Sequence, residues 1–182
     1  MLPTSMRAVV REGHPFATVK ERHIALATQL QQEGYFFVGM RQEHLEAVSN
    51  LILEAEGMTW AMPDDESVAG VLAMDSQHNI VGVAIFGAWG KNDSFFVHLQ
   101  HLSVAEQTRG KGVGSVLAGM LWNVTQRVAD ITYAGIEPTP AAFRFYQRVG
   151  FDIRFPGEPI FFDGAAVFNN NPRFTCWATR PW

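Results

Sequence analysis

The sequence predicts an α/β (α+β) fold in which helices cover both faces of a mixed sheet. Strand-like and helix-like segments alternate in the order β-α-β-β-β-α-β-α-β-β. The composition, 47% hydrophobic and 18% charged, is that of a globular domain, and 182 residues can bury a core without disulfides. We expect residues 1–34 to form a helical extension and residues 35–182 to form a single domain.

The first half of the chain predicts two helices and four strands. Apolar side chains recur at helical spacing over 17–32, and Gly34 can end that helix. A strand over 35–40 and an amphipathic helix over 41–57 follow. Two apolar runs flank a short polar turn and predict a hairpin, and a longer strand comes next. These three strands are expected at 68–75, 79–90 and 94–104.

The second half begins with a glycine-rich turn. A helix over 115–130 and a strand over 131–137 follow it. The segment 139–150 predicts a short helix because Pro140 stands in its first turn and Gly150 just after its end. Late strands are expected at 151–155, 159–162 and 174–179.

The most informative stretch is QTRGKGVGSVL, residues 107–117, with glycines at alternate positions beside two cations. A glycine turn between a strand and a helix points backbone N–H groups and the positive end of the helix dipole at an anion. The spacing lacks the P-loop pattern and departs from the dinucleotide fingerprint. A pyrophosphate held mainly by backbone remains, or a turn without a ligand. The candidate phosphate-binding residues are Arg109, Gly110, Lys111, Gly112, Gly114 and Ser115.

The same loop resembles a known signature. Arg109-x-x-Gly112-x-Gly114 matches the Arg/Gln-x-x-Gly-x-Gly/Ala pattern of the GNAT superfamily of N-acetyltransferases, and AAFRFYQRVGF (141–151) is similar to the family's later helix. The resemblance covers about residues 35–180. It implies a mostly antiparallel sheet of six to seven strands, with a splay between strands four and five. It also implies acetyl-CoA, or another acyl-CoA, as the donor.

The resemblance further assigns residues to that donor. The loop would hold the CoA pyrophosphate, and the backbone of Leu102 and Val104 would pair with the pantetheine arm. Thr139 stands where many members carry an asparagine, and its hydroxyl can still form a hydrogen bond. Tyr146 matches the tyrosine that points at the thioester sulfur, where a phenol can donate a proton to the leaving thiolate.

A base must accept the proton of the attacking amine. Strict alternation along 94–104 predicts that one face carries His98, Gln100, Leu102 and Val104, and that the other carries Leu99, His101 and Ser103. The stretch HLQHLSV is similar to the His-Leu-His-Ala-Leu-Ala-Val strand of arylalkylamine acetyltransferases. That similarity makes His98 the expected base. Glu137, at the end of the strand over 131–137, is a second candidate, and His101 is expected to be structural because it lies on the other face.

We therefore expect an acyl-CoA-dependent N-acetyltransferase that transfers acetyl from acetyl-CoA to a primary amine by direct attack in a ternary complex. The alternative is a non-catalytic CoA-binding or assembly module of the same fold. The acceptor would be a small-molecule or protein amine, since a net charge of −4 argues against nucleic acid.

No cluster has metal-ligand spacing, so no metal is expected. The chain lacks the apolar runs of a signal peptide or a spanning helix, which predicts a cytoplasmic protein, and the extension could support a homodimer.

Overall fold

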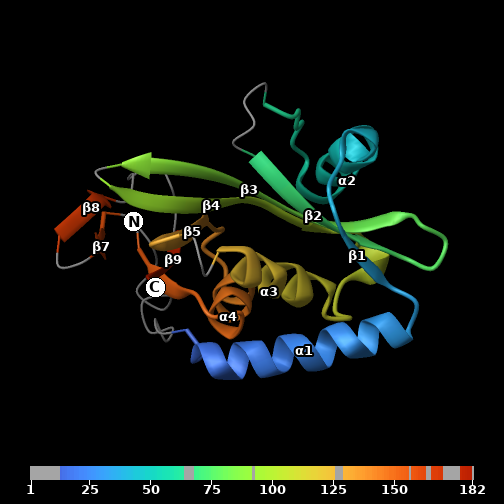
Figure 1. Cartoon of the computed structure of the whole chain (residues 1–182), viewed down its shortest axis with the longest axis horizontal. Helices are drawn as coiled ribbons and strands as arrows, with labels where there is room; N and C mark the ends of the chain where they lie inside the picture. The colour runs from blue at the N-terminus through green and yellow to red at the C-terminus, as the bar shows by residue number, and fades with distance from the viewer. Residues whose placement is uncertain are drawn as a thin grey trace.

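The chain is built around a seven-stranded sheet, drawn in Figure 1 from a computed structural model. The structure describes residues 13–63, 68–91, 93–125, 129–155, 157–162, 165–169 and 177–181. In the sheet order β1-β2-β3-β4-β5-β9-β6, only β4 and β5 are parallel neighbours. The expected mixed and mostly antiparallel sheet is thus confirmed. The strands are β1 (Phe36–Gly39), β2 (Val68–Met74), β3 (Ile80–Lys91), β4 (Ser94–Val104), β5 (Ile131–Gly135), β6 (Asp152–Arg154) and β9 (Trp177–Pro181).

Helices cover both faces of the sheet, as expected (Figure 1). The helix α2 (Leu45–Glu56) packs on one face, where Val48, Leu51 and Ile52 form a core with residues of β2 and β3. On the other face lie α3 (Val113–Thr125) and α4 (Pro140–Arg148), which share the larger core cluster. The amphipathic spacing seen in the sequence therefore corresponds to buried faces.

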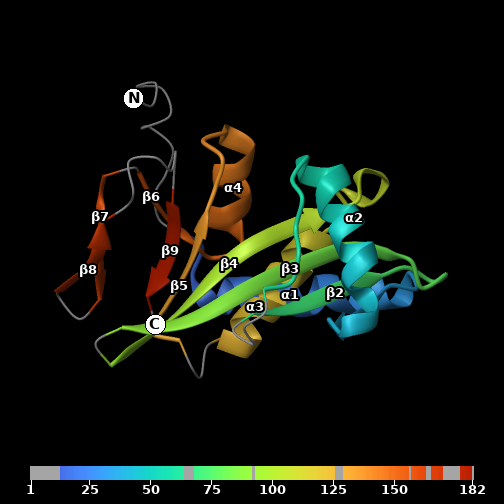
Figure 2. The same ribbon diagram turned by 90° about the horizontal axis from the view of Figure 1, so that it is seen from above.

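The helix α1 (Phe16–Gln32) forms an outer layer over α3. It falls within the segment expected to be an extension, and it buries Val19 and Leu30 in the larger core cluster. Figure 2 shows the remaining strands, β7 (Pro159–Phe162) and β8 (Ala165–Asn169), as a separate pair at one end of the molecule. No sequence pattern had predicted β8.

Several element ends differ from the sequence-based boundaries. The helix α3 begins at Val113 and not at Ser115, because the carbonyl of Gly112 already accepts a hydrogen bond from the Val116 amide. A 3₁₀ turn at Gln42–His44 separates β1 from α2, so the expected helix over 41–57 starts later. The last expected strand, 174–179, is observed as β9, and residues 174–176 lie outside the described part.

A β-bulge interrupts β4 at Gln100. In the pairing with β3, Phe86 opposes Leu99 while its neighbour Ile85 opposes His101, so Gln100 has no opposite residue. Such an extra residue shifts the in–out alternation of every side chain that follows it. The strict alternation assumed from the sequence is therefore wrong beyond Leu99.

The bulge decides which face of the sheet carries each histidine. Cross-strand partners lie on the same face, and Ile85 belongs to the core beneath α2. His101 opposes Ile85, and His98 opposes Gly87, two residues further along β3, so both histidines face α2. The expectation that His98 and His101 occupy opposite faces is corrected. Leu102, expected to share a face with His98, instead points with Ala84 toward the α3 side.

The pairing of β4 with β5 ends early. Four residue pairs join them, from Phe96 with Ile131 to Leu99 with Ala134, while β4 continues to Val104. The β5-facing edge of β4 from Gln100 onward has no strand partner among the described residues. This is the splay between the fourth and fifth strands that the resemblance implied.

Candidate active site

Three adjoining cavities form one groove from the glycine loop to the splay. The loop cavity, of about 570 Å³, lies at the start of α3 and includes Gly112 and Phe145 in its lining. The middle cavity, of about 450 Å³, shares Val104 and Phe145 with the loop cavity. The splay cavity, of about 640 Å³, shares Leu102 and Tyr146 with the middle cavity. Each volume is in the range of small-molecule sites, and the shared lining residues place the three cavities side by side.

The glycine loop brings its backbone to the loop cavity. Gly110 and Gly112 have φ values of +80° and +96°, which favour glycine over any side chain. The first amides of a helix have no intrahelical partner, so those of Val113, Gly114 and Ser115 remain available at this end of α3. All five residues line the loop cavity. The loop therefore has the geometry of an anion site.

Hydrogen bonds hold the two cationic side chains of the loop in place. The Nε atom of Arg109 donates to the Val104 carbonyl at 3.1 Å, which ties the loop to the end of β4. The ammonium of Lys111 donates to the Tyr35 hydroxyl at 3.2 Å. Both cations line the loop cavity, so positive charge surrounds the start of α3.

Tyr146 lies where the middle and splay cavities meet. Its ring meets Phe145 and Phe151 edge-on, with centroid separations of 5.3 and 5.4 Å, which fixes its direction. Burial, and to a lesser degree the negative charge of Glu56, raises the pKa of the Tyr146 hydroxyl far above its ordinary value. The hydroxyl is therefore protonated at neutral pH and can donate a hydrogen bond.

His98 lines the splay cavity against a second tyrosine. Its ring stacks on Tyr133 with centroids 4.6 Å apart, and the Trp89 indole N–H donates to the Tyr133 hydroxyl at 2.9 Å. Burial, with a smaller contribution from the charge of His101, lowers the pKa of His98 to about 4. The imidazole is thus neutral at pH 7, and it is a weaker base than an exposed histidine.

Glu56 was not identified from the sequence. It ends α2 and lines both the middle and the splay cavities, where its carboxylate accepts hydrogen bonds from Ser103 and, at 3.0 Å, from His101. Burial works to raise the pKa of Glu56, but the bonds from His101 and Ser103 and the charge of His101 outweigh it, so the pKa is lowered. Glu56 is therefore ionised at neutral pH. A carboxylate at the end of an amphipathic helix carries no sequence signal that separates it from a solvated one.

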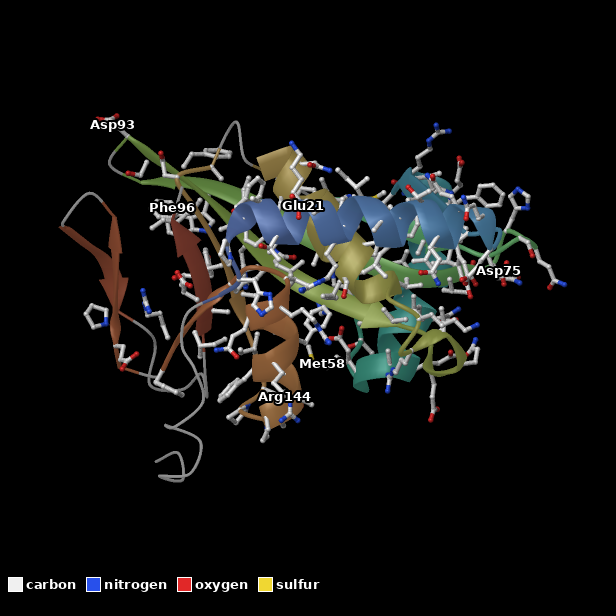
Figure 3. The ribbon with its side chains drawn as sticks, turned by 90° about the horizontal axis from the view of Figure 1, so that it is seen from below. Glu21, Met58, Asp75, Asp93, Phe96 and Arg144 are labelled. Atoms are coloured by element: carbon white, nitrogen blue, oxygen red, sulfur yellow. The ribbon has the colours of Figure 1, made fainter. Side chains whose placement is uncertain are left out.

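The other expected residues occupy different parts of the groove. Glu137 is exposed and lines the splay cavity together with Tyr146 and Met58. Figure 3 shows Met58 between α4 and the end of α2. Thr139 caps α4 by accepting a hydrogen bond from the Ala142 amide at 3.1 Å, and the described linings of the three cavities do not include it. The described residues contain no group of three or more His, Cys, Asp or Glu side chains able to hold a metal ion.

The comparison with protein families agrees with this geometry. Residues 38–169 match the family model described as an acetyltransferase (GNAT) domain. The chain belongs to the GNAT family. No curated protein matches the chain. Over the described residues, no helix has both the length and the apolar character that crossing a membrane requires.

Solved structures share the GNAT fold at low sequence identity. Nourseothricin acetyltransferase is 20% identical, with a TM-score of 0.58 over 81% of this chain and 98% of its own. The ribosomal-protein-S18-alanine N-acetyltransferase from Escherichia coli is 16% identical, with a TM-score of 0.58 over 80% of this chain and 90% of its own. A glucosamine N-acetyltransferase region of a fungal multi-domain GH3 β-N-acetylglucosaminidase is 23% identical, with a TM-score of 0.50 over 73% of this chain and 15% of that one. At these identities the similarity shows a common fold.

The two GNAT motifs lie at different places along the groove. The Arg-x-x-Gly-x-Gly signature lies at the loop cavity, and Tyr146 lies at the opposite end of the middle cavity, next to the splay. Leu102 and Val104, on the part of β4 beyond its pairing with β5, line the stretch between them. The two motifs of the sequence, separated by a helix and a strand, are thus neighbours along one groove.

Proposed function

We propose that this GNAT protein transfers an acetyl group from acetyl-CoA to a primary amine by direct attack in a ternary complex. One observation carries the proposal: a single groove joins the glycine loop, the Tyr146 hydroxyl and the polar splay cavity. A donor lying along the loop and middle cavities would present its reactive end to an acceptor in the splay cavity. Both substrates could then occupy the protein together, without an acetylated residue as intermediate.

The residues of the loop cavity fit a donor that contains pyrophosphate. Two glycines with positive φ bring the backbone close, the first turn of α3 offers amides, and the cavity lining includes cations but no described carboxylate. The edge of β4 near Leu102 and Val104, which has no strand partner among the described residues, could pair with an amide-containing arm. When bound, acetyl-CoA would supply an acetyl group activated as a thioester.

The protonation states of the side chains near the splay decide which of them can donate a proton and which can accept one. Tyr146 keeps its proton because burial raises its pKa, so its hydroxyl can donate toward a leaving sulfur. Neutral His98 can accept a hydrogen bond from an uncharged amine, whereas both nitrogens of an imidazolium are donors and can accept none. Glu137, exposed at the same cavity, is the alternative acceptor of the amine proton.

The splay cavity also supports a cationic acceptor. Glu56 is ionised, and Glu137 brings a second carboxyl group to the same lining, while Met58 adds apolar surface. Opposite charges attract a protonated amine from solution before it loses its proton. A small-molecule amine or an amine of a protein remains the proposed acceptor class.

The test combines binding with turnover. Calorimetry should show acetyl-CoA binding, and thiol release with a panel of primary amines should give intersecting initial-velocity lines, as a ternary complex requires. Tyr146→Phe should lower kcat by about 10²-fold, since general acid catalysis contributes that much or more, with little change in acetyl-CoA affinity. Parallel lines would contradict direct attack.

The same experiment distinguishes an active transferase from the alternative, a non-catalytic CoA-binding module. Binding of acetyl-CoA without transfer to any amine of a broad panel would favour that alternative. Absence of acetyl-CoA binding would overturn the donor assignment itself.

A further inference from the structure

The loop cavity contains more positive charge than the glycine loop supplies. Besides Arg109 and Lys111, its lining includes Arg22 from α1 and Arg148 from the last turn of α4. The described lining contains no Asp or Glu. Four cations from three elements therefore converge on one cavity, in a chain whose net charge is −4. A cavity lined by charges of one sign attracts ligands of the opposite sign, here anions.

The helix α1 is held against this cavity. A Cβ atom built on Gly112 would lie 3.1 Å from Cδ2 of Leu26, so α1 approaches the loop backbone closely. Leu26 and Arg22 are four residues apart and share one face of α1, and both line the loop cavity. The Tyr35 hydroxyl, just beyond α1, accepts the hydrogen bond from Lys111. The segment thus forms one wall of the cavity.

Arg22 is positioned and keeps free donors. Its Nη1 donates to the carbonyl of Arg148 at 3.1 Å, and its Nη2 lies 3.4 Å from Nδ1 of His14. A guanidinium has five N–H donors, so these contacts leave donors for a ligand. The bond to the Arg148 carbonyl also joins α1 to the last turn of α4 at the cavity.

We propose that α1 completes the donor site and that Arg22, with Arg148, binds a phosphate monoester of the donor, the 3′-phosphate of CoA. The inference rests on the proposed function, in which the glycine loop holds the pyrophosphate of acetyl-CoA. CoA carries the monoester as a separate dianionic group on its ribose, and the loop amides with Arg109 and Lys111 already match the pyrophosphate. Guanidinium groups bind phosphate oxygens in pairs through charge-assisted hydrogen bonds.

This assignment gives α1 a role that the family match does not cover. Residues 38–169 match the GNAT model, and Arg22 lies outside them. A purely structural role for Arg22, as a link between α1 and α4, is the competing explanation. The two differ in one respect: a structural link affects every ligand of the groove equally, whereas a phosphate contact distinguishes ligands with and without the monoester.

The experiment measures the affinities of CoA and 3′-dephospho-CoA for the full chain by calorimetry. Wild-type protein should bind CoA at least tenfold more tightly than dephospho-CoA. Arg22→Gln and Arg148→Gln should each weaken CoA binding about tenfold and leave dephospho-CoA binding unchanged, since each removes one charge-assisted contact. Arg148→Gln retains the backbone carbonyl that Arg22 uses, so it tests the charge without breaking that link. Arg22→Lys should retain part of the preference for CoA.

Lys20→Gln is the matched control, because Lys20 is a cation on the same helix that is not among the described residues of the loop cavity. It should leave both affinities unchanged. Equal loss of both affinities in Arg22→Gln, or no preference of the wild type for CoA, would overturn the inference while leaving the donor assignment intact. Failure of the wild type to bind either compound would instead overturn the proposed function, and the inference with it.

Discussion

Alanine at two neighbouring glycines of the loop should change stability in opposite directions. Gly112 has a φ of +96°, and an added Cβ would lie 3.1 Å from Leu26, so Gly112→Ala forces a side chain into a strained conformation and a tight contact. Gly114 has no positive φ, stands in the first turn of α3, and would place its Cβ 3.5 Å from Val104 and 3.7 Å from Phe145. Those are ordinary contact distances.

The magnitudes follow from these two environments. Holding an L-residue in a sparsely populated region costs about 2 kcal/mol, which lowers the Tm of a domain of this size by about 4–8 °C. Replacing a helical glycine by alanine gains about 0.5–1 kcal/mol, or about 1–4 °C. The same geometry accounts for the GNAT signature, which accepts Ala at the position of Gly114 but only Gly at that of Gly112.

Thermal unfolding of the unliganded variants, followed by acetyl-CoA titration, tests this reasoning. Gly112→Ala should melt below the wild type and bind acetyl-CoA more weakly, because the loop amides are displaced. Gly114→Ala should melt above it and retain binding, while Gly114→Leu should block the groove between Val104 and Phe145. A shift of both alanine variants in the same direction would refute the assignment of strain to Gly112 alone.

Three further outcomes are expected. Burial lowers the pKa of His98 from 6.5 to about 4, so the unfolded state binds more protons than the folded state between these pH values. The free energy of unfolding should therefore decrease as the pH falls from 6.5 to 4. In urea titrations, His98→Gln should make this decrease smaller. Glu56→Gln should raise the KM of a cationic amine several-fold, and an unchanged KM would remove Glu56 from acceptor binding. Gly119→Ala should destabilise the protein by about 1–3 kcal/mol in the same titrations, since its Cβ would overlap the His23 ring of α1, and a neutral effect would mean that α1 does not pack closely there.

The sequence predicted the bounds of an element well where apolar alternation or flanking Pro and Gly residues mark them. The boundaries of β4 agree with the expected strand over 94–104, and Pro140 and Gly150 bracket α4 as proposed. The glycine loop and Tyr146 were identified because both lie in short motifs. The Gln100 bulge was not, since a single unpaired residue leaves no trace in an apolar alternation and depends on the pairing with β3.

The sequence by itself determined most of the order of strands and helices, the position of the glycine loop and the GNAT resemblance. These depend on residues that are close in the chain, such as the cations and glycines between Arg109 and Gly114. Only the tertiary structure decided that His98 and His101 share a face, that burial makes His98 a weak base, and that Glu56 and Arg22 reach the groove. Such properties arise from strand register and from helix packing between distant segments, and local sequence encodes neither.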